Sequence, residues 1–306
     1  MIQRFSMLSH DGKTTLACYR TVCDEPRGLV QISHGMCEYF LRYEGFAEFL
    51  AGCGLLVFGH DHLGHGHTAP DAASLGFTVS GGGGAECLAE DVLALAARMR
   101  EEYPGLPLVL FGHSMGSFIA REALARRGEL YRAAVICGTG GPEMPAGAGR
   151  ALARLIMLFR GERHRSRLLR AAAFAGYNKK YNSPATGVDW LSRDPEVVRR
   201  YLADPLCNFT FTVRAYDDLF TLVGRVSRRD WPSRLPGGLP VLVTSGEMDP
   251  VGGWGRGVRQ VAERLRRAGL PVTLRLWPGM RHEILNEIGH EQVWKETGEW
   301  ILEQMR

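Results

Sequence analysis

The sequence predicts an α/β fold with a mostly parallel, twisted sheet flanked by helices and a helical cap insertion. Three observations lead to this prediction. Short apolar runs typical of buried strands alternate with helical periodicity over residues 1–140. The alternation stops over 141–225, where helical patterns continue without a convincing strand, and it resumes over 226–306. We therefore expect a core formed by residues 1–140 and 226–306, with residues 141–225 as the cap.

The first part of the expected core begins with a hairpin, because Asp11-Gly12 is a turn signal between β-rich runs at 5–8 and 14–19. Apolar runs predict further strands at 29–32, 55–58, 108–111 and 133–137. Two helices are marked by residues that share one helical face, which are Tyr43, Phe46, Ala47 and Leu50, then Leu88, Val92, Leu95 and Met99. Another helix is expected from about Gly116.

The second part of the expected core continues the same order after the cap. A strand over 240–243 is followed by a helix whose apolar face consists of Val258, Val261, Ala262 and Leu265. A strand over 272–276 and a final helix near 293–305 complete it.

Composition excludes several classes of protein. The 306 residues are 45% hydrophobic and 23% charged, which is ordinary globular usage and excludes disordered, collagen-like and coiled-coil chains. A net charge of +4 is too small to indicate a nucleic-acid partner. Seven scattered cysteines without a Cys-x-x-Cys pair disfavour a disulfide framework or a zinc ribbon. With no apolar signal segment and no membrane span of ~20 residues, we expect a soluble, cytoplasmic protein.

The sharpest chemical signal is Gly112-His113-Ser114-Met115-Gly116, placed between an apolar strand and a helix. A nucleophilic serine on a tight strand-to-helix turn needs small neighbours, because the turn is strained and crowded. The helix start also brings N–H groups and a positive dipole end to the reacting oxygen. The motif predicts Ser114 as a nucleophile, with a plain turn as the alternative.

A serine nucleophile needs a base, and the base needs an orienting acid. The expected chain order in this type of fold is Ser, acid, His. Asp249 lies in the loop after the 240–243 strand and is the predicted acid, although it could be a simple turn former and Glu247 competes with it. His282 follows the last core strand and is the predicted base, whereas His290 is expected at the surface. The adjacent Glu283 could tune His282 but is expected to be a solvated acid.

Acyl transfer also requires donors for the oxyanion. His34-Gly35 follows the strand at 29–32, and one donor in this type of fold comes from the loop after that strand. The other donor comes from the residue after the nucleophile. We assign the backbone N–H groups of Met36 and Met115, with Gly35 allowing close backbone approach.

Taken together, these motifs resemble the monoacylglycerol lipase and lysophospholipase group of α/β-hydrolases, a family that includes some serine aminopeptidases. The resemblance covers nearly the whole chain. It is carried by His34 to Tyr39 with Arg42-Tyr43, Asp61 to Gly66, Gly112 to Gly116, Asp189 to Asp194, Tyr201 to Cys207, Ser245 to Gly252, and Arg281 to Glu283. The loop Met36-Cys37-Glu38-Tyr39 departs from the group's usual small residue followed by Gly-Glu-His.

The resemblance implies a serine ester hydrolase acting on small lipid esters, through the α/β-hydrolase fold and without a cofactor. It also implies that polar residues near the nucleophile hold the alcohol side of the substrate. The matching positions are Glu38, Arg42, His113 and Tyr201. Each has a structural alternative: Arg42 and Glu38 could form an ion pair, His113 could fill the turn, and Tyr201 could pack within the cap.

The histidine-rich run at 60–67 suggests a metal cluster at first sight. The two-metal pattern His-x-His-x-Asp-His would need an acid at the position of Gly64, so we predict no metal and expect Asp61 and His65 in polar packing. The glycines at 81–84 lack the Gly-Lys-Ser/Thr of a phosphate loop.

A basic segment opens the expected cap. Residues 149–180 contain seven Arg, two Lys and one Glu, and Leu152, Leu155, Ile156 and Phe159 form one helical stripe there. Such a helix suits peripheral contact with anionic lipid, or it packs its apolar face on the core with solvated arginines outside. The cap as a whole has a net charge of +6 and the core −2.

The sequence therefore predicts a carboxylic ester hydrolase for monoacylglycerol or lysophospholipid, working through a Ser-His-Asp triad and an acyl-enzyme. A serine aminopeptidase is one alternative, but it needs acids in the cap, which the +6 charge disfavours. A low-turnover ligand-binding receptor on the same fold is the other. No nucleic acid and no obligate protein partner are expected.

Overall fold

The computed structural model describes residues 1–181 and 185–306. Its centre is an eight-stranded sheet with the order β1-β2-β4-β3-β5-β6-β7-β8. The strands are β1 (Ile2–Leu8), β2 (Thr15–Thr21), β3 (Leu29–Ser33), β4 (Leu56–His60), β5 (Leu108–His113), β6 (Ala133–Cys137), β7 (Val241–Gly246) and β8 (Val272–Trp277). The β1–β2 and β2–β4 pairs are antiparallel and the other pairs are parallel. The predicted mostly parallel sheet is confirmed.

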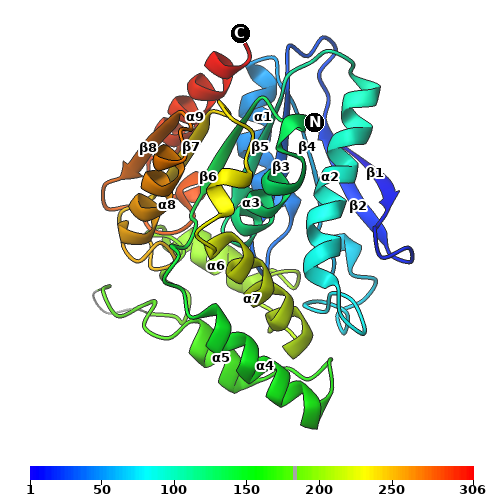
Figure 1. The fold of residues 1–306 in the computed structure, drawn as a ribbon, viewed down its shortest axis with the longest axis vertical. Coiled ribbons are helices and arrows are strands. Elements are labelled where there is room, and N and C mark those ends of the chain that lie inside the picture. Colours follow the sequence, from blue (N-terminus) through cyan, green and yellow to red (C-terminus); the bar gives the residue numbers. More distant parts are fainter. Residues whose placement is uncertain (182–184) are drawn as a thin grey trace.

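Helices cover both faces of this sheet (Figure 1). The α-helices of the described chain are α1 (Glu44–Gly52), α2 (Gly84–Glu102), α3 (Met115–Arg127), α4 (Ala146–Arg160), α5 (Arg167–Ala173), α6 (Pro195–Ala203), α7 (Val213–Ser227), α8 (Arg256–Arg267) and α9 (His290–Gln304). Apolar residues of α1 and α9 pack on one face, and those of α2, α3 and α8 pack on the other.

The strand β3 shows why the central strands read as continuous apolar runs. Val30 and Ile32 belong to the apolar cluster on the α1 and α9 face, whereas Leu29 belongs to the opposite cluster. Gln31 is also buried there, and its amide donates to the Val92 carbonyl and accepts from the Tyr131 hydroxyl. Both faces are covered, so polar residues enter such a strand only with partners.

The predicted hairpin is present at the edge of the sheet. Ile2 pairs with Thr21 at one end and Leu8 with Thr15 at the other. Gly12 has a φ of 69°, which glycine adopts without steric cost, and Asp11 Oδ1 accepts from the N–H of Lys13 at 2.8 Å. The turn chemistry read from the sequence therefore sets the register of β1 on β2.

The segment between β6 and β7 holds α4, α5, α6 and α7, and no strand occurs among its described residues. Helix α4 packs along α7, and α7 contacts α3 of the core. Figure 1 shows α4 and α5 at the lower end of the molecule, with α7 between them and the sheet. Helix α7 ends at Ser227, two residues past the expected boundary, and the division of the chain into core and cap stays a prediction.

Candidate active site

Ser114 lies at the turn between β5 and α3, with φ 54° and ψ −121°. Few residues other than glycine adopt a positive φ, so this backbone is strained. A Cβ atom on Gly116 would collide with the carbonyl oxygens of Ser33 and His34, and one on Gly112 would lie 2.6 Å from the Gly116 oxygen. The crowding explains why the turn carries glycine on both sides of the serine.

His282 and Asp249 meet at the ends of neighbouring strands. The distance from His282 Nδ1 to Asp249 Oδ1 is 3.0 Å, and both side chains are buried. The ring nitrogen is not aligned for a hydrogen bond with its neighbours. Contacts of this kind are often poorly aligned before substrate binds and then tighten.

The loop after β7 holds the Asp249 carboxylate in place. It accepts hydrogen bonds from the Ser245 hydroxyl at 2.8 Å and the Val251 N–H at 2.9 Å. Burial alone would raise the pKa of Asp249, but the charge of His282 and these hydrogen bonds outweigh burial and lower the pKa. The carboxylate is therefore ionised at neutral pH and suited to stabilise a positively charged imidazole.

The two competing residues lie elsewhere. Glu247 is half-buried and its backbone N–H donates to Trp277, without a contact to His282. His290 lies at the start of α9, against Trp294. The structure thus places Asp249, and not the alternative acid Glu247, beside His282. The other candidate histidine, His290, lies away from Asp249.

Glu283 contradicts its sequence-based expectation. It is not a solvated acid but is only 4% exposed, and its Oε2 accepts from Arg42 Nη2 at 2.6 Å. The partner lies 241 positions away in the chain, so the adjacent sequence gave no signal of this ion pair.

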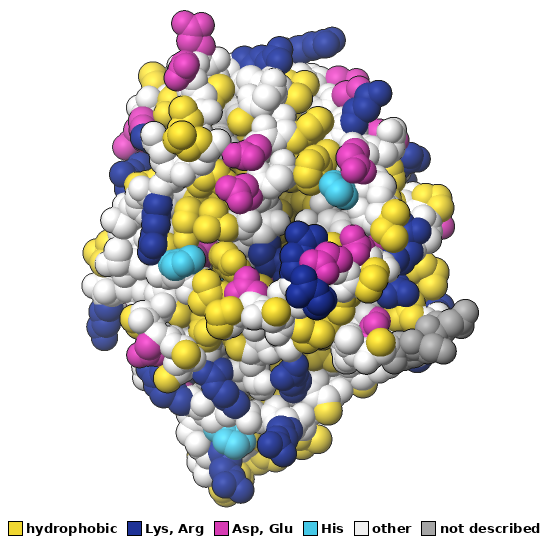
Figure 2. Space-filling model, turned by 180° about the vertical axis from the view of Figure 1, so that it is seen from behind, with side chains coloured by type: hydrophobic (Ala, Val, Ile, Leu, Met, Phe, Trp, Pro, Cys, Tyr) yellow, Lys and Arg dark blue, Asp and Glu magenta, His cyan; other side chains and the backbone are white. Residues whose placement is uncertain are grey.

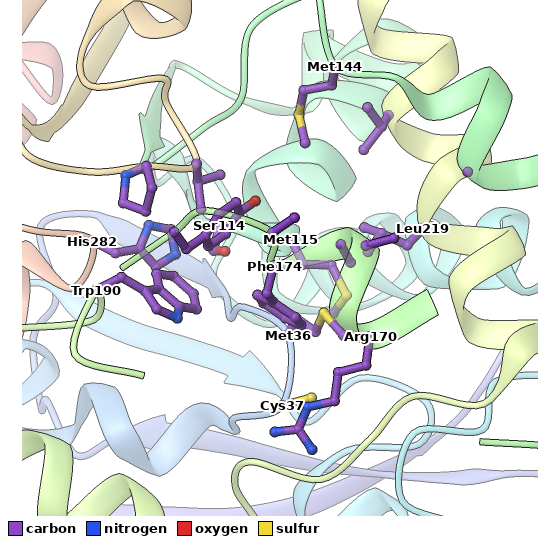
Figure 3. Close-up of a pocket in the computed structure, with 18 of the residues that line it drawn as sticks. Met36, Cys37, Ser114, Met115, Met144, Arg170, Phe174, Trp190, Leu219 and His282 are labelled. Atoms are coloured by element: carbon purple, nitrogen blue, oxygen red, sulfur yellow. The ribbon is translucent and has the colours of Figure 1, made fainter. Parts of the chain in front are cut away.

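His282 is also held by the segment between β6 and β7. Its ring lies between those of Trp190 and His113, with ring centres 5.0 and 4.7 Å away. The backbone N–H of His282 donates to the Trp190 carbonyl at 3.3 Å. His282 and Ser114 line the same cavity (Figure 3), and no hydrogen bond joins these two described side chains. Trp190 was not predicted to contact the base, although it lies in one of the motifs that carry the resemblance.

The loop after β3 passes directly beside Ser114. A Cβ atom on Gly35 would lie 3.1 Å from the Ser114 Cβ. Among residues 1–181 and 185–306, no acceptor takes the backbone N–H of Met36 or of Met115. Both donors assigned from the sequence are therefore available beside the serine.

His34 fixes the direction of the Met36 donor. The His34 Nδ1–H donates to the Gly35 carbonyl at 2.8 Å, because its Nε2 accepts from the N–H of His62 at 2.9 Å. The Gly35 carbonyl and the Met36 N–H belong to one peptide group, so holding one orients the other. Burial, with the charge of His65, lowers the pKa of His34 to about 3 and keeps its ring neutral.

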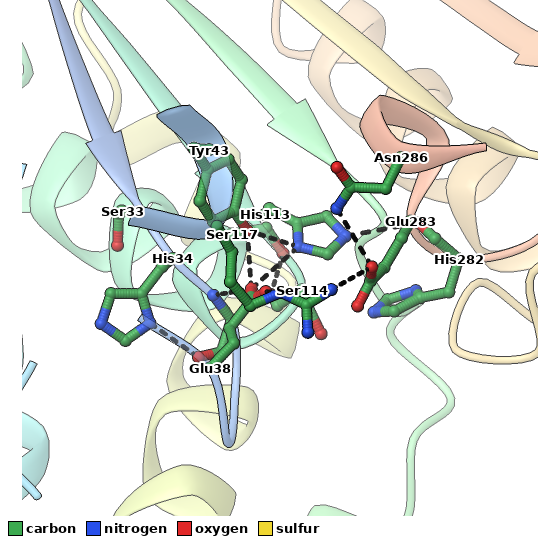
Figure 4. A network of polar contacts seen from close by, with 12 residues as sticks. Ser33, His34, Glu38, Tyr43, His113, Ser114, Ser117, His282, Glu283 and Asn286 are labelled. Carbon is green, nitrogen blue, oxygen red and sulfur yellow. Dashed lines mark hydrogen bonds and ion pairs between the residues drawn. The ribbon is translucent and has the colours of Figure 1, made fainter. Parts of the chain in front are cut away.

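Glu38 lies at the centre of a buried polar network (Figure 4). Its Oε1 accepts from the Gly35 N–H at 2.5 Å and from the Tyr43 hydroxyl at 2.6 Å. His113 Nδ1 lies 2.8 Å from that hydroxyl and 3.3 Å from Oε1. Burial would raise the pKa of Glu38, but His113 and Arg42 lower it well below its usual range. Tyr43 was predicted as part of a helix face and of a motif that carries the resemblance, but no polar role was assigned to it.

Of the four residues assigned to the alcohol side of a substrate, three line the cavity and one does not. Glu38, His113 and Tyr201 line the cavity, whereas Arg42 is not among the lining residues. Arg42 lies behind them, 3.7 Å from Glu38 and with its guanidinium 4.8 Å from the centre of the Tyr201 ring. One of the structural alternatives, the Arg42–Glu38 ion pair, is thus present.

The cavity has a volume of about 1120 Å³. Met36, Cys37 and Met115 line it from the core, and the helices between β6 and β7 supply mostly apolar side chains. These include Leu152, Leu169, Phe174, Leu219, Phe220 and Val223. A largely apolar cavity of this size suits a ligand with a hydrocarbon chain.

The histidine-rich run is buried from His60 to His65, whereas His67 is exposed. Asp61 accepts hydrogen bonds from the N–H groups of Phe40 and His67 and from the Tyr19 hydroxyl. His65 contacts the Leu63 carbonyl at 3.0 Å. Within the described part of the chain, no group of three or more His, Cys, Asp or Glu side chains is placed to hold a metal ion.

The chain is similar to known proteins over most of its length. The model of the family described as serine aminopeptidase, S33, matches residues 24–289. The chain is 29% identical to a monoacylglycerol lipase of Mycolicibacterium smegmatis, covering 92% of this chain and 90% of that protein. It is 27% identical to monoglyceride lipase of Mus musculus, covering 96% and 89%. A thermostable carboxyl esterase from Bacillus coagulans, solved with glycerol, superimposes with a TM-score of 0.94 at 29% identity, covering 100% and 99%.

Proposed function

The chain belongs to the serine aminopeptidase S33 family of α/β-hydrolases, and on that premise we propose that it is a serine ester hydrolase acting on small lipid esters. The family match confirms the resemblance to the monoacylglycerol lipase group on which the sequence analysis rested. The finer assignments below, of catalytic residues and of substrate, are our proposals.

One observation carries the proposal: Ser114 and His282 line the same largely apolar cavity, and Asp249 is buried beside the His282 ring. Ser114 sits on a strained turn that exposes its hydroxyl to the cavity, and His282 Nδ1 lies 3.0 Å from Asp249. A nucleophile, a base and an orienting acid beside an apolar chamber are the parts that hydrolysis of a fatty ester requires.

In the proposed mechanism, the Ser114 hydroxyl attacks the ester carbonyl while His282 Nε2 takes its proton. Asp249 orients the ring and stabilises the imidazolium, and the N–H groups of Met36 and Met115 bind the oxyanion. His282 then gives the proton to the leaving alcohol, and an acyl-enzyme forms on Ser114. Water, activated by the same histidine, releases the fatty acid.

We propose monoacylglycerol or lysophospholipid as the substrate. The relatives from Mycolicibacterium smegmatis and Mus musculus are named for monoacylglycerol, and the esterase from Bacillus coagulans was solved with glycerol. Tyr201 lines the cavity, and its hydroxyl forms no hydrogen bond among the described residues, so it is available to an alcohol. Glu38 and His113 also face the cavity but are occupied by each other and by Tyr43.

The charges of the cavity lining bear on the alternative, a serine aminopeptidase. An amino terminus would need an unpaired carboxylate to bind its charge. Of the described lining residues, Glu38 and Glu283 pair with Arg42, and Glu143 pairs with Arg256. The charge arrangement therefore favours an ester over an aminoacyl substrate.

We also propose that the start of the segment between β6 and β7 contacts anionic lipid. The apolar stripe predicted on this helix does not lie on one surface. Leu152 lines the cavity, whereas Leu155 and Phe159 are 56% and 75% exposed. Leu158 and Leu168 add to this exposed apolar surface. Lys and Arg side chains gather between apolar ones over the lower part of the face in Figure 2. Among the described helices, none has the length and apolarity needed to cross a bilayer.

The lipid contact is tested by binding to phosphatidylserine vesicles. Each basic residue near such a surface contributes on the order of 1 kcal/mol, screened beyond a Debye length of ~8 Å at physiological salt. Binding should weaken with added salt and again in Phe159→Ser/Arg160→Glu, but not in the control Arg259→Glu on α8. Absence of vesicle binding, or binding that salt leaves unchanged, would contradict the lipid contact.

The enzymatic proposal is tested by labelling and turnover together. A fluorophosphonate probe should label the purified protein at Ser114 and fail to label Ser114→Ala, and the protein should turn over a short p-nitrophenyl ester. Labelling without turnover would instead indicate a receptor. Competition among monoacylglycerol, lysophosphatidylcholine and an aminoacyl amide then separates lipase, lysophospholipase and aminopeptidase.

A further inference from the structure

One region of the cavity carries polar groups that the proposed reaction does not use. Arg170 comes from α5 and Tyr216 from α7, and both line the cavity with Asn208 and Thr210. In the view of Figure 3, Arg170 lies on the far side of Met36 from Ser114. The lining around them is otherwise mostly apolar, so these groups need a reason to be there.

The Arg170 guanidinium has only neutral partners among the described residues. Its Nη1 donates to Thr210 Oγ1 and its Nη2 to Asn208 Oδ1, each at 2.9 Å. By contrast, Arg154 and Arg150 of α4 both pair with the carboxylate of Asp217. A guanidinium has five N–H donors, so Arg170 keeps both its charge and unused donors at the cavity wall.

Tyr216 provides a second, independent observation. Its side chain is fully buried, lines the cavity, and has a hydroxyl without a hydrogen-bond partner among the described residues. The ring is fixed by packing on Phe211 and Phe220, with centres 5.6 and 6.0 Å away. Phenylalanine would pack equally well there, and a buried hydroxyl without a partner is destabilising, so packing does not account for the oxygen.

The two groups act on the same part of the cavity. Burial is the main reason that the pKa of Tyr216 is raised, and the positive charge of Arg170 acts on it in the opposite direction. The chain also connects the two groups, because Arg170 donates to Thr210 and the adjacent Phe211 packs its ring 5.6 Å from that of Tyr216. Both groups are hydrogen-bond donors.

We propose that Arg170 and Tyr216 form a subsite for an anionic group, a carboxylate or a phosphate, carried by the ester substrate. This inference rests on the proposed ester hydrolase function and narrows its substrate class. Carboxylate and phosphate oxygens accept charge-assisted hydrogen bonds from a guanidinium and also accept from a phenol. The apolar surroundings strengthen such contacts, whereas an uncharged lipid would leave the guanidinium with its neutral partners alone.

The anion can lie on either side of the ester, and two substrate pairs distinguish these cases. On the acyl side, p-nitrophenyl hexanoate is compared with mono-p-nitrophenyl adipate, which has the same chain length and a terminal carboxylate. On the alcohol side, oleoylglycerol is compared with oleoylglycerol phosphate. The readout is the ratio of kcat/KM for the anionic ester to that for the neutral ester in each pair.

In the wild-type protein, the anionic ester should be preferred in at least one pair. Hydrogen bonds to charged groups are strong enough that Arg170→Gln should lower that ratio roughly tenfold to a hundredfold. Tyr216→Phe should lower it by a smaller factor, roughly threefold to tenfold, without lowering the melting temperature, because no protein contact is lost. The exposed Arg259→Gln on α8 lies outside the proposed lipid contact and is the control, which should leave the ratio unchanged.

The outcomes separate this inference from the function on which it rests. If the wild-type protein hydrolyses neither neutral ester, the proposed function is wrong. If it hydrolyses them but shows no anionic preference in either pair, or if Tyr216→Phe and Arg170→Gln leave the ratios unchanged, only the anion subsite is wrong. Should Arg170→Gln fail to fold, the Tyr216→Phe ratio decides the question alone.

Discussion

The two walls of the cavity differ in how completely their polar groups are paired. On the wall formed by the core, Glu38 accepts from Gly35 and Tyr43 and lies beside His113, and Glu283 pairs with Arg42. On the wall formed by the segment between β6 and β7, the indole N–H of Trp190 and the hydroxyl of Tyr216 have no partner among the described residues.

The difference separates two tasks. Apart from His282 Nδ1, the groups beside the serine are held by hydrogen bonds and ion pairs before the reaction. Donors fixed in advance need no reorganisation in the transition state. Groups that meet the variable part of a ligand are left for the ligand to satisfy. We therefore expect substitutions in the core wall to act on turnover of every ester, and substitutions in the other wall to act on the choice among esters.

The largest effect should come from Ser114 on the core wall. Ser114→Ala should lower kcat for any ester by roughly 10⁵- to 10⁶-fold, and His282→Ala should be similarly severe. Asp249→Asn should cost roughly 10⁴-fold, because the amide favours the wrong tautomer of the ring and does not stabilise the imidazolium. Double variants should add little, since the three side chains act as a unit. Steady-state assays on a p-nitrophenyl ester measure these losses.

The matched control for the acid is Glu247→Gln, which should retain wild-type turnover. Near wild-type activity in purified Ser114→Ala would refute the proposed mechanism. If activity were lost in Glu247→Gln and kept in Asp249→Asn, the orienting acid would have to be reassigned.

A second large effect should appear in the acid stability of the core wall. His34, His60, His62 and His65 are buried behind the loop after β3, and burial is the main cause of their lowered pKa values, to about 3 for His34 and about 4 for His60 and His65. The unfolded chain binds protons at these rings below about pH 6.5, while the folded chain does not until lower pH. Stability is therefore fully present above pH ~6.5 and is lost as the pH falls toward about 4.

Urea unfolding at a series of pH values measures this loss. Each ring contributes up to about 1.4 kcal/mol per pH unit to the slope of the unfolding free energy. His60→Asn should make the slope shallower, and the exposed His10→Gln should not. A stability that is flat over this pH range would mean that the four rings are protonated equally in both states.

The secondary structure and the site differ in how far the sequence predicted them. Strands buried on both faces form unbroken apolar runs, so β3, β5 and β7 could be placed from local sequence alone. Ser114 and Asp249 follow such strands directly, and their position at the ends of parallel strands brings them together. His282 likewise follows the end of a parallel strand, β8, which lies next to β7 in the sheet.

The ion pairs and unpaired groups of the cavity could not be predicted in this way. Glu283 was expected in solvent but pairs with Arg42 from the other end of the chain. The spacing of Tyr43 to Phe46 and Leu50 indicated an apolar helix face, and only the fold places its hydroxyl against Glu38. Such contacts join segments that local periodicity treats as independent, so they depend on packing that no single segment determines.

An intermediate effect should follow from Glu38, which tests whether the core wall serves turnover. Glu38→Gln keeps the shape but removes the charge between Arg42 and His113 and weakens the hold on the Gly35 N–H. If the oxyanion donors lose their alignment, kcat should fall on the order of 10²-fold with little change in KM. Assays with oleoylglycerol and a p-nitrophenyl ester measure both constants.

Glu143→Gln is the control, because Glu143 is an exposed lining residue paired with Arg256. An unchanged kcat with a higher KM for oleoylglycerol alone would show that Glu38 contacts the alcohol of the substrate, as the family resemblance implies, and that the network around it is not needed for turnover.

The smallest effect should come from Tyr201, whose phenol comes from α6 and faces the cavity. Burial holds the pKa of Tyr201 well above its usual range, so the hydroxyl remains a donor at any working pH. Tyr201→Phe removes one hydrogen bond to the alcohol side, which should lower kcat/KM for oleoylglycerol roughly threefold to tenfold. A p-nitrophenyl ester has no such hydroxyl and should be hydrolysed as before, and Tyr103→Phe at the end of α2 should affect neither ester. Equal losses on both esters would mean that Tyr201 serves packing in the segment between β6 and β7. The core wall and the wall formed by that segment would then not differ in acting on turnover and on the choice among esters.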